Sequence, residues 1–486
     1  MGRIEMAGAR TLQFVDRTQA FPAKRPATAR AEDFREIADR YAPQAAEDQA
    51  GRCSQCGVPY CSVHCPLHNH IPDWLRLTAE GRLREAYELS NATSTMPEIC
   101  GRICPQDRLC EGNCVIEFSG HGAVTIGSVE KFITETAWEQ GWVEPIVPGP
   151  DRGMSVGIIG AGPAGLAAAE YLRGYGYAVH VYDRYDRAGG LLTYGIPGFK
   201  LEKPVVMRRV DRLAAAGIVF HYDFAVGRDA SLDELRERHD AVLIATGVYK
   251  ARGIKAPGVG SDGVVEALDF LIASNRKGFG DAVPAFDDGS LDAAGKHVVV
   301  IGGGDTAMDC VRTAVRQGAA SVKCLYRRDR ANMPGSQREV ANAEEEGVEF
   351  VWLSAPQAFE AGGSQVSAVR ATRMRLGAPD ASGRRAPEEE PDSAFRLDAD
   401  LVIKALGYDA EDLPRLFAAP ALGVTRWGTV LVDNKTLMTS LDGVFAAGDI
   451  VRGASLVVWA IRDGQDVAKN MHAWLKAKAG AGRKAA

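Results

Sequence analysis

Ser155-Val-Gly-Ile-Ile-Gly-Ala-Gly-Pro-Ala-Gly165 is the stretch that decides the fold of this 486-residue chain. Its apolar run predicts a buried strand over residues 155–159, and a GxGxxG turn follows directly. Residues 166–174 then predict a helix, and residues 177–182 a second strand that ends at Asp183. A strand, a glycine turn, a helix and a terminal acid in this order are typical of a Rossmann-type dinucleotide site. We therefore predict dinucleotide binding here rather than a merely structural turn.

A second copy of this pattern begins at Lys296. Its strand, turn, helix and second strand are predicted over residues 298–301, 302–307, 308–318 and 321–325. Tyr326 stands where Asp183 stood in the first copy, and Arg327 and Arg328 follow it. An acid there would repel a 2′-phosphate, whereas a guanidinium group can bind one in bidentate fashion. The second site is therefore predicted to select NADP(H); the alternative is a solvated arginine pair at a strand end.

Two further motifs indicate how the two sites share the chain. Ala245-Thr-Gly247 ends a predicted strand over residues 241–244 and marks a crossover between domains. Asp442-Gly-Val-Phe-Ala-Ala-Gly448-Asp449 resembles the segment whose Asp contacts the ribityl and pyrophosphate groups of the flavin in flavoproteins with two dinucleotide domains. The first copy is therefore assigned to FAD, and the NADPH domain is expected to be inserted into the FAD domain.

The candidate binding residues follow from these motifs. Those expected at FAD are Gly160, Gly162, Pro163, Ala164, Gly165, Asp183, Gly190, Leu191, Gly195, Ile196, Pro197, Thr246, Gly247, Gly448 and Asp449. Those expected at NADPH are Gly302, Gly304, Asp305, Thr306, Ala307, Arg327 and Arg328. Hydride transfer needs the nicotinamide C4 close to the flavin N5, which is positioning rather than acid–base chemistry. No catalytic side chain is therefore expected.

Cysteines are concentrated ahead of these motifs. The chain has ten, and eight of them form two quartets: Cys53, Cys56, Cys61 and Cys65, then Cys100, Cys104, Cys110 and Cys114. Disulfides need an oxidising compartment, and the start of the chain lacks the apolar region of a signal peptide. Zinc sites usually pair two short hooks, whereas a four-cysteine run that ends in Cys-Pro is typical of bacterial ferredoxins. The residues favour iron–sulfur clusters; zinc and reactive or structural thiols are the alternatives.

The ferredoxin pattern also predicts a grouping. The cysteine before the proline ligates the other cluster in such runs. One cluster is therefore expected on Cys65, Cys104, Cys110 and Cys114. The other is expected on Cys53, Cys56 and Cys61, with Cys100 or Glu130 as the fourth ligand. The remaining two cysteines, Cys310 and Cys324, form no CxxC motif and are expected to be buried structural thiols.

Composition and net charge exclude some classes of function. A net charge of −6 gives no electrostatic case for nucleic acid, and no apolar stretch reaches the length of a membrane span. A cytoplasmic location is expected. Residues 1–50 are expected to be a solvated arm or surface helix, or else a partner-docking arm, and a helix is predicted from Pro72 to Leu89. A further helix is predicted over residues 129–138.

The expected fold is α/β. It has two Rossmann-like dinucleotide-binding domains in a glutathione-reductase-like arrangement, preceded by a mainly α-helical iron–sulfur domain. The boundaries are expected at residues 1–150 for the iron–sulfur domain, 151–252 and 408–486 for the two parts of the FAD domain, and 253–407 for the NADPH domain.

From about residue 10 to 475 the chain resembles the small (beta) subunits of bacterial NADPH-dependent glutamate synthases. The stretches that carry the resemblance begin at Arg52, Pro97, Gly189 and Gly302: RCSQCGVPYC, PEICGRICPQDRLCEGNC, GGLLTYGIPGFK and GGGDTAMD. The N-terminal part of dihydropyrimidine dehydrogenase is similar too. In that group one cluster can take a ligand other than cysteine, which favours Glu130 over Cys100.

The resemblance implies a division of labour. NADPH would deliver a hydride to FAD on this chain, and electrons would leave through two [4Fe-4S] clusters to FMN on a large (alpha) subunit. There glutamine and 2-oxoglutarate would give glutamate. No cysteine precedes Cys53, so the N-terminal nucleophile of such a glutaminase is not expected here. Two alternatives remain: an NADPH-dependent FAD/iron–sulfur subunit that serves another acceptor such as ferredoxin, and a zinc-stapled scaffold without redox activity.

Overall fold

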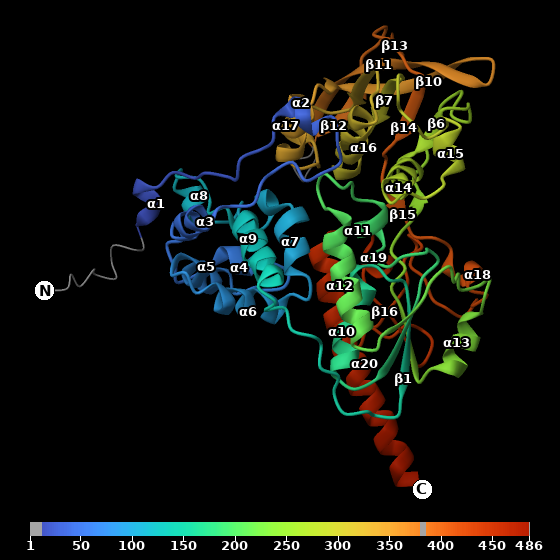
Figure 1. The fold of residues 1–486 in the computed structure, drawn as a ribbon. Helices are drawn as coiled ribbons and strands as arrows, with labels where there is room; N and C mark the ends of the chain where they lie inside the picture. The colour runs from blue at the N-terminus through green and yellow to red at the C-terminus, as the bar shows by residue number, and fades with distance from the viewer. Residues whose placement is uncertain (1–11, 380–384, 486) are drawn as a thin grey trace, which may run out of the picture.

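A computed structural model describes residues 12–379 and 385–485 of the chain. The first residues, on which the signal-peptide argument rests, lie outside this part. Figure 1 shows a group of helices from the N-terminal third beside two sheet-containing parts, one stacked above the other. No helix in the described ranges is both long and apolar enough to cross a membrane.

Short helices build the N-terminal part. They are α3 (Pro43–Ala50), α4 (Tyr60–Val63), α5 (Ile71–Ala79), α6 (Leu83–Thr93), α7 (Pro97–Ile103), α8 (Val115–Phe118) and α9 (Ile126–Glu139). The helix predicted over residues 129–138 is confirmed as α9. The single helix predicted from Pro72 to Leu89 is wrong, because the chain turns between α5 and α6 at Gly81, where φ is +72°. All eight cysteines of the two quartets lie in or between these helices.

The first fingerprint lies in a five-stranded parallel sheet with strand order β16-β4-β1-β2-β3. Its strands are β1 (Ser155–Ile159), β2 (Ala178–Tyr182), β3 (Val219–His221), β4 (Ala241–Ile244) and β16 (Val444–Ala446). Its helices are α10 (Pro163–Gly174), α11 (Leu191–Tyr194), α12 (Lys203–Ala215), α13 (Leu232–Arg238), α18 (Leu413–Leu416), α19 (Asp449–Arg452) and α20 (Val457–Ala485). Three of them, α10, α12 and α20, lie on the side that faces the N-terminal helices (Figure 1). The strands predicted around this fingerprint are confirmed.

The second fingerprint lies in another five-stranded parallel sheet, with order β6-β14-β7-β8-β9. Its strands are β6 (Val264–Glu266), β7 (His297–Ile301), β8 (Ser321–Leu325), β9 (Glu349–Val351) and β14 (Leu401–Lys404). Its helices are α14 (Ala267–Gly278), α15 (Pro284–Asp287), α16 (Asp305–Arg316) and α17 (Gln337–Glu345). The two crossings between the sheet-containing parts pair with each other, as β5 (Lys250–Ala251) lies antiparallel to β15 (Tyr408–Asp409).

An antiparallel sheet was not predicted from the sequence. It consists of β10 (Ser354–Gly362), β11 (Gln365–Pro379), β12 (Arg385–Glu389) and β13 (Phe395–Asp398), between β9 and β14. Its buried side chains pack with those of the second parallel sheet in one apolar cluster. Its strands carry no GxGxxG turn or other dinucleotide-binding motif that would mark them in the sequence.

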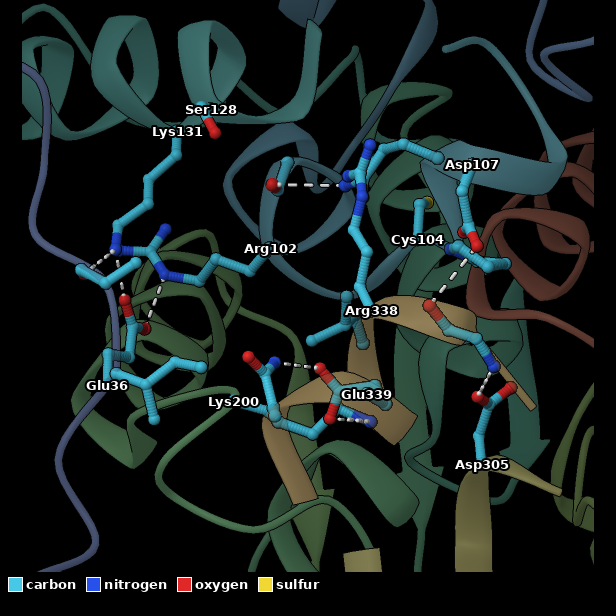
Figure 2. Close-up of a pocket in the computed structure, with 18 of the residues that line it drawn as sticks. Glu36, Arg102, Cys104, Asp107, Ser128, Lys131, Lys200, Asp305, Arg338 and Glu339 are labelled. Carbon is cyan, nitrogen blue, oxygen red and sulfur yellow. Dashed lines mark hydrogen bonds and ion pairs between the residues drawn. The ribbon is translucent and has the colours of Figure 1, made fainter. Parts of the chain in front are cut away.

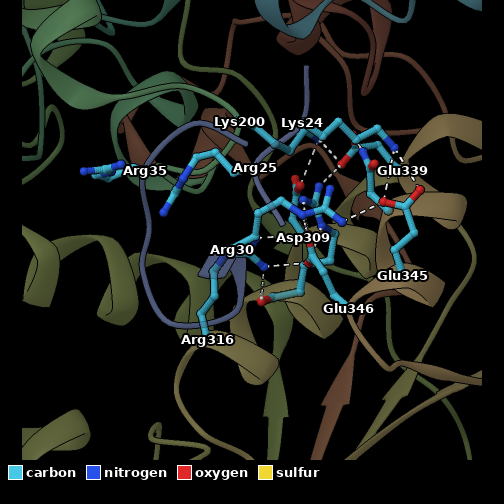
Figure 3. Close-up of polar contacts among 12 residues, drawn as sticks. Lys24, Arg25, Arg30, Arg35, Lys200, Asp309, Arg316, Glu339, Glu345 and Glu346 are labelled. Carbon is cyan, nitrogen blue, oxygen red and sulfur yellow. Dashed lines mark hydrogen bonds and ion pairs between the residues drawn. The ribbon is translucent and has the colours of Figure 1, made fainter. Parts of the chain in front are cut away.

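The N-terminal arm is more than a solvated segment. Arg30 ends the short helix α2 (Ala27–Arg30) and is 1% exposed, and its Nη2 donates to Glu345 Oε2 over 2.6 Å. Lys24 also pairs with Glu345, and the Ile37 amide donates to the carbonyl of Phe199. Figure 3 shows these side chains meeting over α16 and α17. The expectation of a solvated arm is therefore corrected: the arm bridges the two sheet-containing parts.

A fully buried ion pair joins the N-terminal helices to the first parallel sheet. Glu98 on α7 accepts two hydrogen bonds from the Arg209 guanidinium on α12, at 2.7 and 2.8 Å. Both side chains are at most 1% exposed. The Trp138 ring lies over the same guanidinium, 5.4 Å from its carbon. α7 carries Cys100, so this pair fixes the cysteine-bearing helix against the first parallel sheet and its helices.

Candidate functional site

The first glycine fingerprint has the geometry that a bound pyrophosphate needs. Gly160 has φ of +107°, and a Cβ there would lie 2.4 Å from the Ala245 carbonyl oxygen. A Cβ on Gly165 would lie 2.0 Å from the Gly160 carbonyl, so only glycine allows α10 to pack this close. Gly162 caps α10, and a Cβ added there would meet no other atom within 4 Å. Open space therefore lies at the N-terminus of a twelve-residue helix, where the helix dipole favours an anion.

Of the two acids expected at this site, Asp183 is buried and Asp449 is half-buried. Asp183 follows β2, and its carboxylate accepts the amides of Ala161 and Tyr185 at 2.6 and 2.9 Å. Asp449 begins α19 just after β16, and burial raises its pKa to about 6. The two lie at the carboxyl ends of strands in one parallel sheet, the edge at which such folds bind ligands.

An unsatisfied hydroxyl supports the fit of a cofactor to this edge. Thr246 follows β4, and its Oγ1 is buried without a hydrogen-bond partner among the residues that the structure describes. Buried hydroxyl groups are nearly always paired, so a bound group is the natural partner. The 189–197 loop packs against the first glycine turn. The Gly189 amide donates to the Ala161 carbonyl, and a Cβ on Gly190 would lie 2.9 Å from Gly162 Cα.

The second fingerprint repeats this design in the other parallel sheet. Gly302 has φ of +151°, and a Cβ there would lie 2.3 Å from the Ala405 carbonyl oxygen. Gly304 caps α16, and a Cβ added there would again meet no other atom within 4 Å. Asp305, at the start of α16, accepts the Ser336 amide at 2.9 Å. Thr306 and the buried Ala307 follow it in the first turn.

The predicted 2′-phosphate pair lies just beyond β8. Arg327 is exposed, and Arg328 is half-buried. Arg328 Nε is a buried donor without a partner in the described part of the chain, which fits an anionic ligand at this strand end. The neighbouring Arg330 is different, because it already pairs with Glu344 at 2.7 Å.

A chamber of about 550 Å³ opens between the three parts of the molecule. Thr306 from the second fingerprint, Ile196 from the 189–197 loop and Cys104 from the helical part all line it. Figure 2 shows Cys104 and Asp107 on one side of this space and Asp305 and Glu339 on the other. Both dinucleotide sites and one cysteine group therefore border a common space.

One group of cysteines surrounds a smaller cavity of about 40 Å³. Its lining includes the possible ligands Cys65, Cys100, Cys104, Cys110 and Glu130. Burial raises the pKa of Glu130 to about 8, and Ser90 Oγ donates to this carboxylate at 3.0 Å. These groups surround a space rather than converge on one point: within the described residues, no three His, Cys, Asp or Glu side chains are placed to hold a single metal ion. Soft sulfur donors around a cavity fit an iron–sulfur cluster.

The other cysteines form a second group nearer the surface. Burial raises the pKa of Cys53 to about 11 and that of Cys61 to about 12, and in both cases the nearby Cys114 sulfur adds to the shift. Burial and then Cys114 also raise the pKa of Cys56, whose sulfur points toward the Val58 carbonyl at the surface. The structure thus brings Cys53, Cys56, Cys61 and Cys114 together.

This arrangement corrects the expected grouping at one position. Cys65 does leave the first quartet and lie with Cys104 and Cys110, as expected. Cys114, however, lies with Cys53, Cys56 and Cys61. Cys100 and Glu130, which were the two candidates for the fourth ligand of that cluster, lie beside Cys65 instead. The turn over residues 106–114 explains the difference. A Cβ on Gly112 would lie 1.9 Å from the Asp107 carbonyl oxygen, and this tight turn lies between Cys110, which lines the small cavity, and Cys114, which does not.

Sequence reasoning missed the contacts that connect the cysteine-bearing part to the second fingerprint. Arg108, close to Cys104 and Cys110 in the chain, pairs with Asp305 at 3.0 Å and donates to the Pro334 carbonyl at 2.6 Å. Glu111 is buried and pairs with Arg338. No local motif marks these residues, because each partner lies about 200 positions away in the chain. Cys310 and Cys324 are buried.

Comparison with known proteins places this architecture in a family. Residues 30–142 match the model described as dihydropyrimidine dehydrogenase domain II, 4Fe-4S cluster, and residues 154–464 match pyridine nucleotide-disulphide oxidoreductase. FprA from Mycobacterium tuberculosis, in complex with NADPH, has a TM-score of 0.56 and 23% identity, over 68% of this chain and 86% of that one. This likeness shows that the two share a fold.

Two curated relatives span nearly the whole chain. The glutamate synthase [NADPH] small chain of Azospirillum brasilense is 68% identical over 474 residues, which is 98% of each protein. The glutamate synthase [NADPH] small chain of Escherichia coli is 46% identical and covers 96% of this chain and 98% of its own length. This chain is therefore an oxidoreductase that belongs to the family of glutamate synthase [NADPH] small chains.

Proposed function

We infer that this chain is the electron-input subunit of an NADPH-dependent glutamate synthase. It oxidises NADPH at FAD and passes the electrons through iron–sulfur clusters to a large subunit, which makes glutamate from glutamine and 2-oxoglutarate. The observation that carries this inference is the common chamber bordered by Thr306, Ile196 and Cys104. A nicotinamide from one fingerprint, a flavin ring from the other and a cluster ligand would all reach it.

The protein's contribution to hydride transfer is positional. When bound, FAD accepts the hydride and releases electrons singly. We propose that the Gly160–Gly165 turn, Asp183, Thr246, Gly247, Gly448 and Asp449 hold its dinucleotide. The backbone of the 190–197 loop would line the ring. Gly302, Gly304, Asp305, Thr306 and Ala307 would hold the NADPH pyrophosphate, and Arg327 and Arg328 its 2′-phosphate.

Two [4Fe-4S] clusters are proposed for the cysteine groups. The outer cluster would be held by Cys53, Cys56, Cys61 and Cys114. The inner cluster would be held by Cys65, Cys104 and Cys110, with Glu130 as the fourth ligand and Cys100 as the alternative. Because Cys104 also lines the chamber, the inner cluster would receive electrons from the flavin and the outer cluster would release them.

The partner is proposed to be a large subunit that carries FMN, and its docking face is proposed on residues 1–150. Apolar side chains surround the outer cysteine group here: Val58, Tyr60, Val63, Val115 and Phe118 are all exposed. Phe118, on α8 just after Cys114, is 72% exposed. Exposed apolar patches mark interaction surfaces, and this one covers the point at which electrons would leave.

We propose a cytoplasmic location and the domain boundaries 1–150, 151–252, 253–407 and 408–486. The pairing of β5 with β15 supports the second and third boundaries, since these strands are the two crossings between the sheet-containing parts. In this arrangement the NADPH domain is an insertion between Gly247 and Gly448 of the FAD domain.

The first prediction concerns nucleotide choice. Replacing Arg327 and Arg328 with Gln should raise the KM for NADPH by about tenfold or more per residue, because each charge-assisted contact contributes about 1.5–3 kcal/mol. The KM for NADH, which has no 2′-phosphate, should change little. Arg330→Gln is the matched control, since that arginine is already paired. An unchanged NADPH/NADH preference in the double variant would contradict the assignment.

The second prediction concerns the cluster ligands. Cys65→Ala and Cys110→Ala should damage one cluster, and Cys53→Ala and Cys114→Ala the other. Iron content and EPR spectra of the reduced proteins distinguish the two losses, and Cys310→Ala should lose neither. If Cys114→Ala gave the spectrum of Cys65→Ala, the proposed ligand sets would be wrong.

The third prediction is that the isolated chain is a diaphorase. With bound FAD it should reduce ferricyanide or a tetrazolium dye at the expense of NADPH. Glutamine plus 2-oxoglutarate should cause no NADPH oxidation until the large subunit is added. Glutamate formation by this chain alone would overturn the proposal, and so would dye reduction by protein that contains no flavin.

The fourth prediction locates the partner. Phe118→Asp should weaken binding of the large subunit at least tenfold in a titration, because a charge would replace an apolar contact at the centre of the patch. Dye reduction should be unchanged, since Phe118 lies away from the chamber. Trp427→Asp is the control, as Trp427 is 66% exposed but lies in the last part of the chain. Equal affinities for the two variants would rule out this face.

A further inference from the structure

Lys203 holds the loop that borders the chamber. It is the first residue of α12, and its Nζ donates to the Leu192 carbonyl at 3.1 Å and to the Ile196 carbonyl. The first carbonyl belongs to α11, and the second lies two residues beyond the end of this helix. One ammonium group therefore fixes the backbone of the segment on which the flavin ring is proposed to rest.

This ammonium has no counter-ion within the part of the chain that the structure describes. No carboxylate there lies within ion-pair distance of Lys203, and burial lowers its pKa to about 7, with Asp309 opposing the shift. Lys200, three residues earlier, makes a useful contrast. Like Lys203 it is half-buried, but it pairs directly with Asp309 at 2.9 Å, and this carboxylate raises its pKa although the loss of hydration lowers it.

Lys203 is half-buried, and a cation that loses part of its water without gaining an anion is costly, because carbonyl dipoles replace only part of its hydration. Hydride transfer would supply the missing charge. The C4–H bond of NADPH breaks, its electron pair and the hydrogen move to the flavin ring, and NADP⁺ leaves. The ring gains two electrons and one proton, so it gains one negative charge. That charge would arise at the loop that Lys203 holds.

We propose that Lys203 is a positioning residue of the flavin site, which fixes the 191–197 loop through two carbonyls and stabilises the reduced flavin with its positive charge. The inference rests on the proposed function, since it assumes that FAD occupies the first dinucleotide site. It adds a role for a side chain that belongs to neither fingerprint.

The reduction potential of the bound flavin tests this role. Lys203→Met keeps the length of the side chain but removes its charge and its donors. At a fixed ambient potential, the ratio of reduced to oxidised FAD should fall about tenfold, which is a decrease of about 30 mV for a two-electron couple. Lys203→Arg, which keeps the charge, should recover most of this loss.

Two further measurements separate the possible outcomes. Lys255→Met is the matched control, because it removes an exposed lysine from the same chain and should leave the potential unchanged. The visible spectrum of the bound flavin should shift in Lys203→Met and return toward normal in Lys203→Arg, because the loop backbone borders the ring. If Lys203→Met does not fold, Lys203→Gln retains a donor while removing the charge.

The failure of this inference differs from the failure of the proposed function. A wild-type potential in a folded, FAD-loaded Lys203→Met or Lys203→Gln variant would overturn the role of Lys203 alone. A wild-type chain that binds no FAD would overturn both. An equal loss of potential in Lys203→Arg would show that the charge is not the cause, and would also count against the proposal.

Discussion

The buried pair between Glu98 and Arg209 is the constraint on which the rest of the arrangement depends. An ion pair with no access to water is stable only while both partners stay in place, since removal of one leaves an uncompensated charge at a cost of about 3–5 kcal/mol. Glu98 lies on the helix that precedes Cys104, and Arg209 lies on the helix that follows the 189–197 loop. The pair therefore fixes a proposed cluster ligand relative to the proposed flavin site.

Charged contacts also hold the second parallel sheet against the rest of the molecule. Arg108 and Glu111, from the turn between the inner and outer cysteine groups, pair with Asp305 and Arg338. The arm residue Arg30 joins Glu345 on α17. The three parts thus meet around the chamber through side chains of which only Asp305 belongs to a cofactor motif, and the distances between the proposed redox centres follow from this docking.

Much of the fold could be predicted because it is local. A strand, a glycine turn and a helix occupy about 20 consecutive residues, and Gly160, Gly165 and Gly302 are each required by a contact within that unit or with the next strand. Asp183 and Arg328 could be placed for the same reason, since each follows a strand of known direction. The helix break at Gly81 was missed because apolar spacing continues across it, while a single positive φ ends the helix.

The sequence by itself determined that there are two dinucleotide folds, that eight cysteines are grouped ahead of them, and that arginines follow the second strand of the second fold where an acid follows that of the first. Only the tertiary structure decided which cysteines share a cavity, which side chains border the chamber, and where Lys203 directs its ammonium. The physical reason is separation along the chain. Contacts between residues 10 to 300 positions apart depend on how the helices and sheets pack, and packing leaves no periodic trace in the sequence.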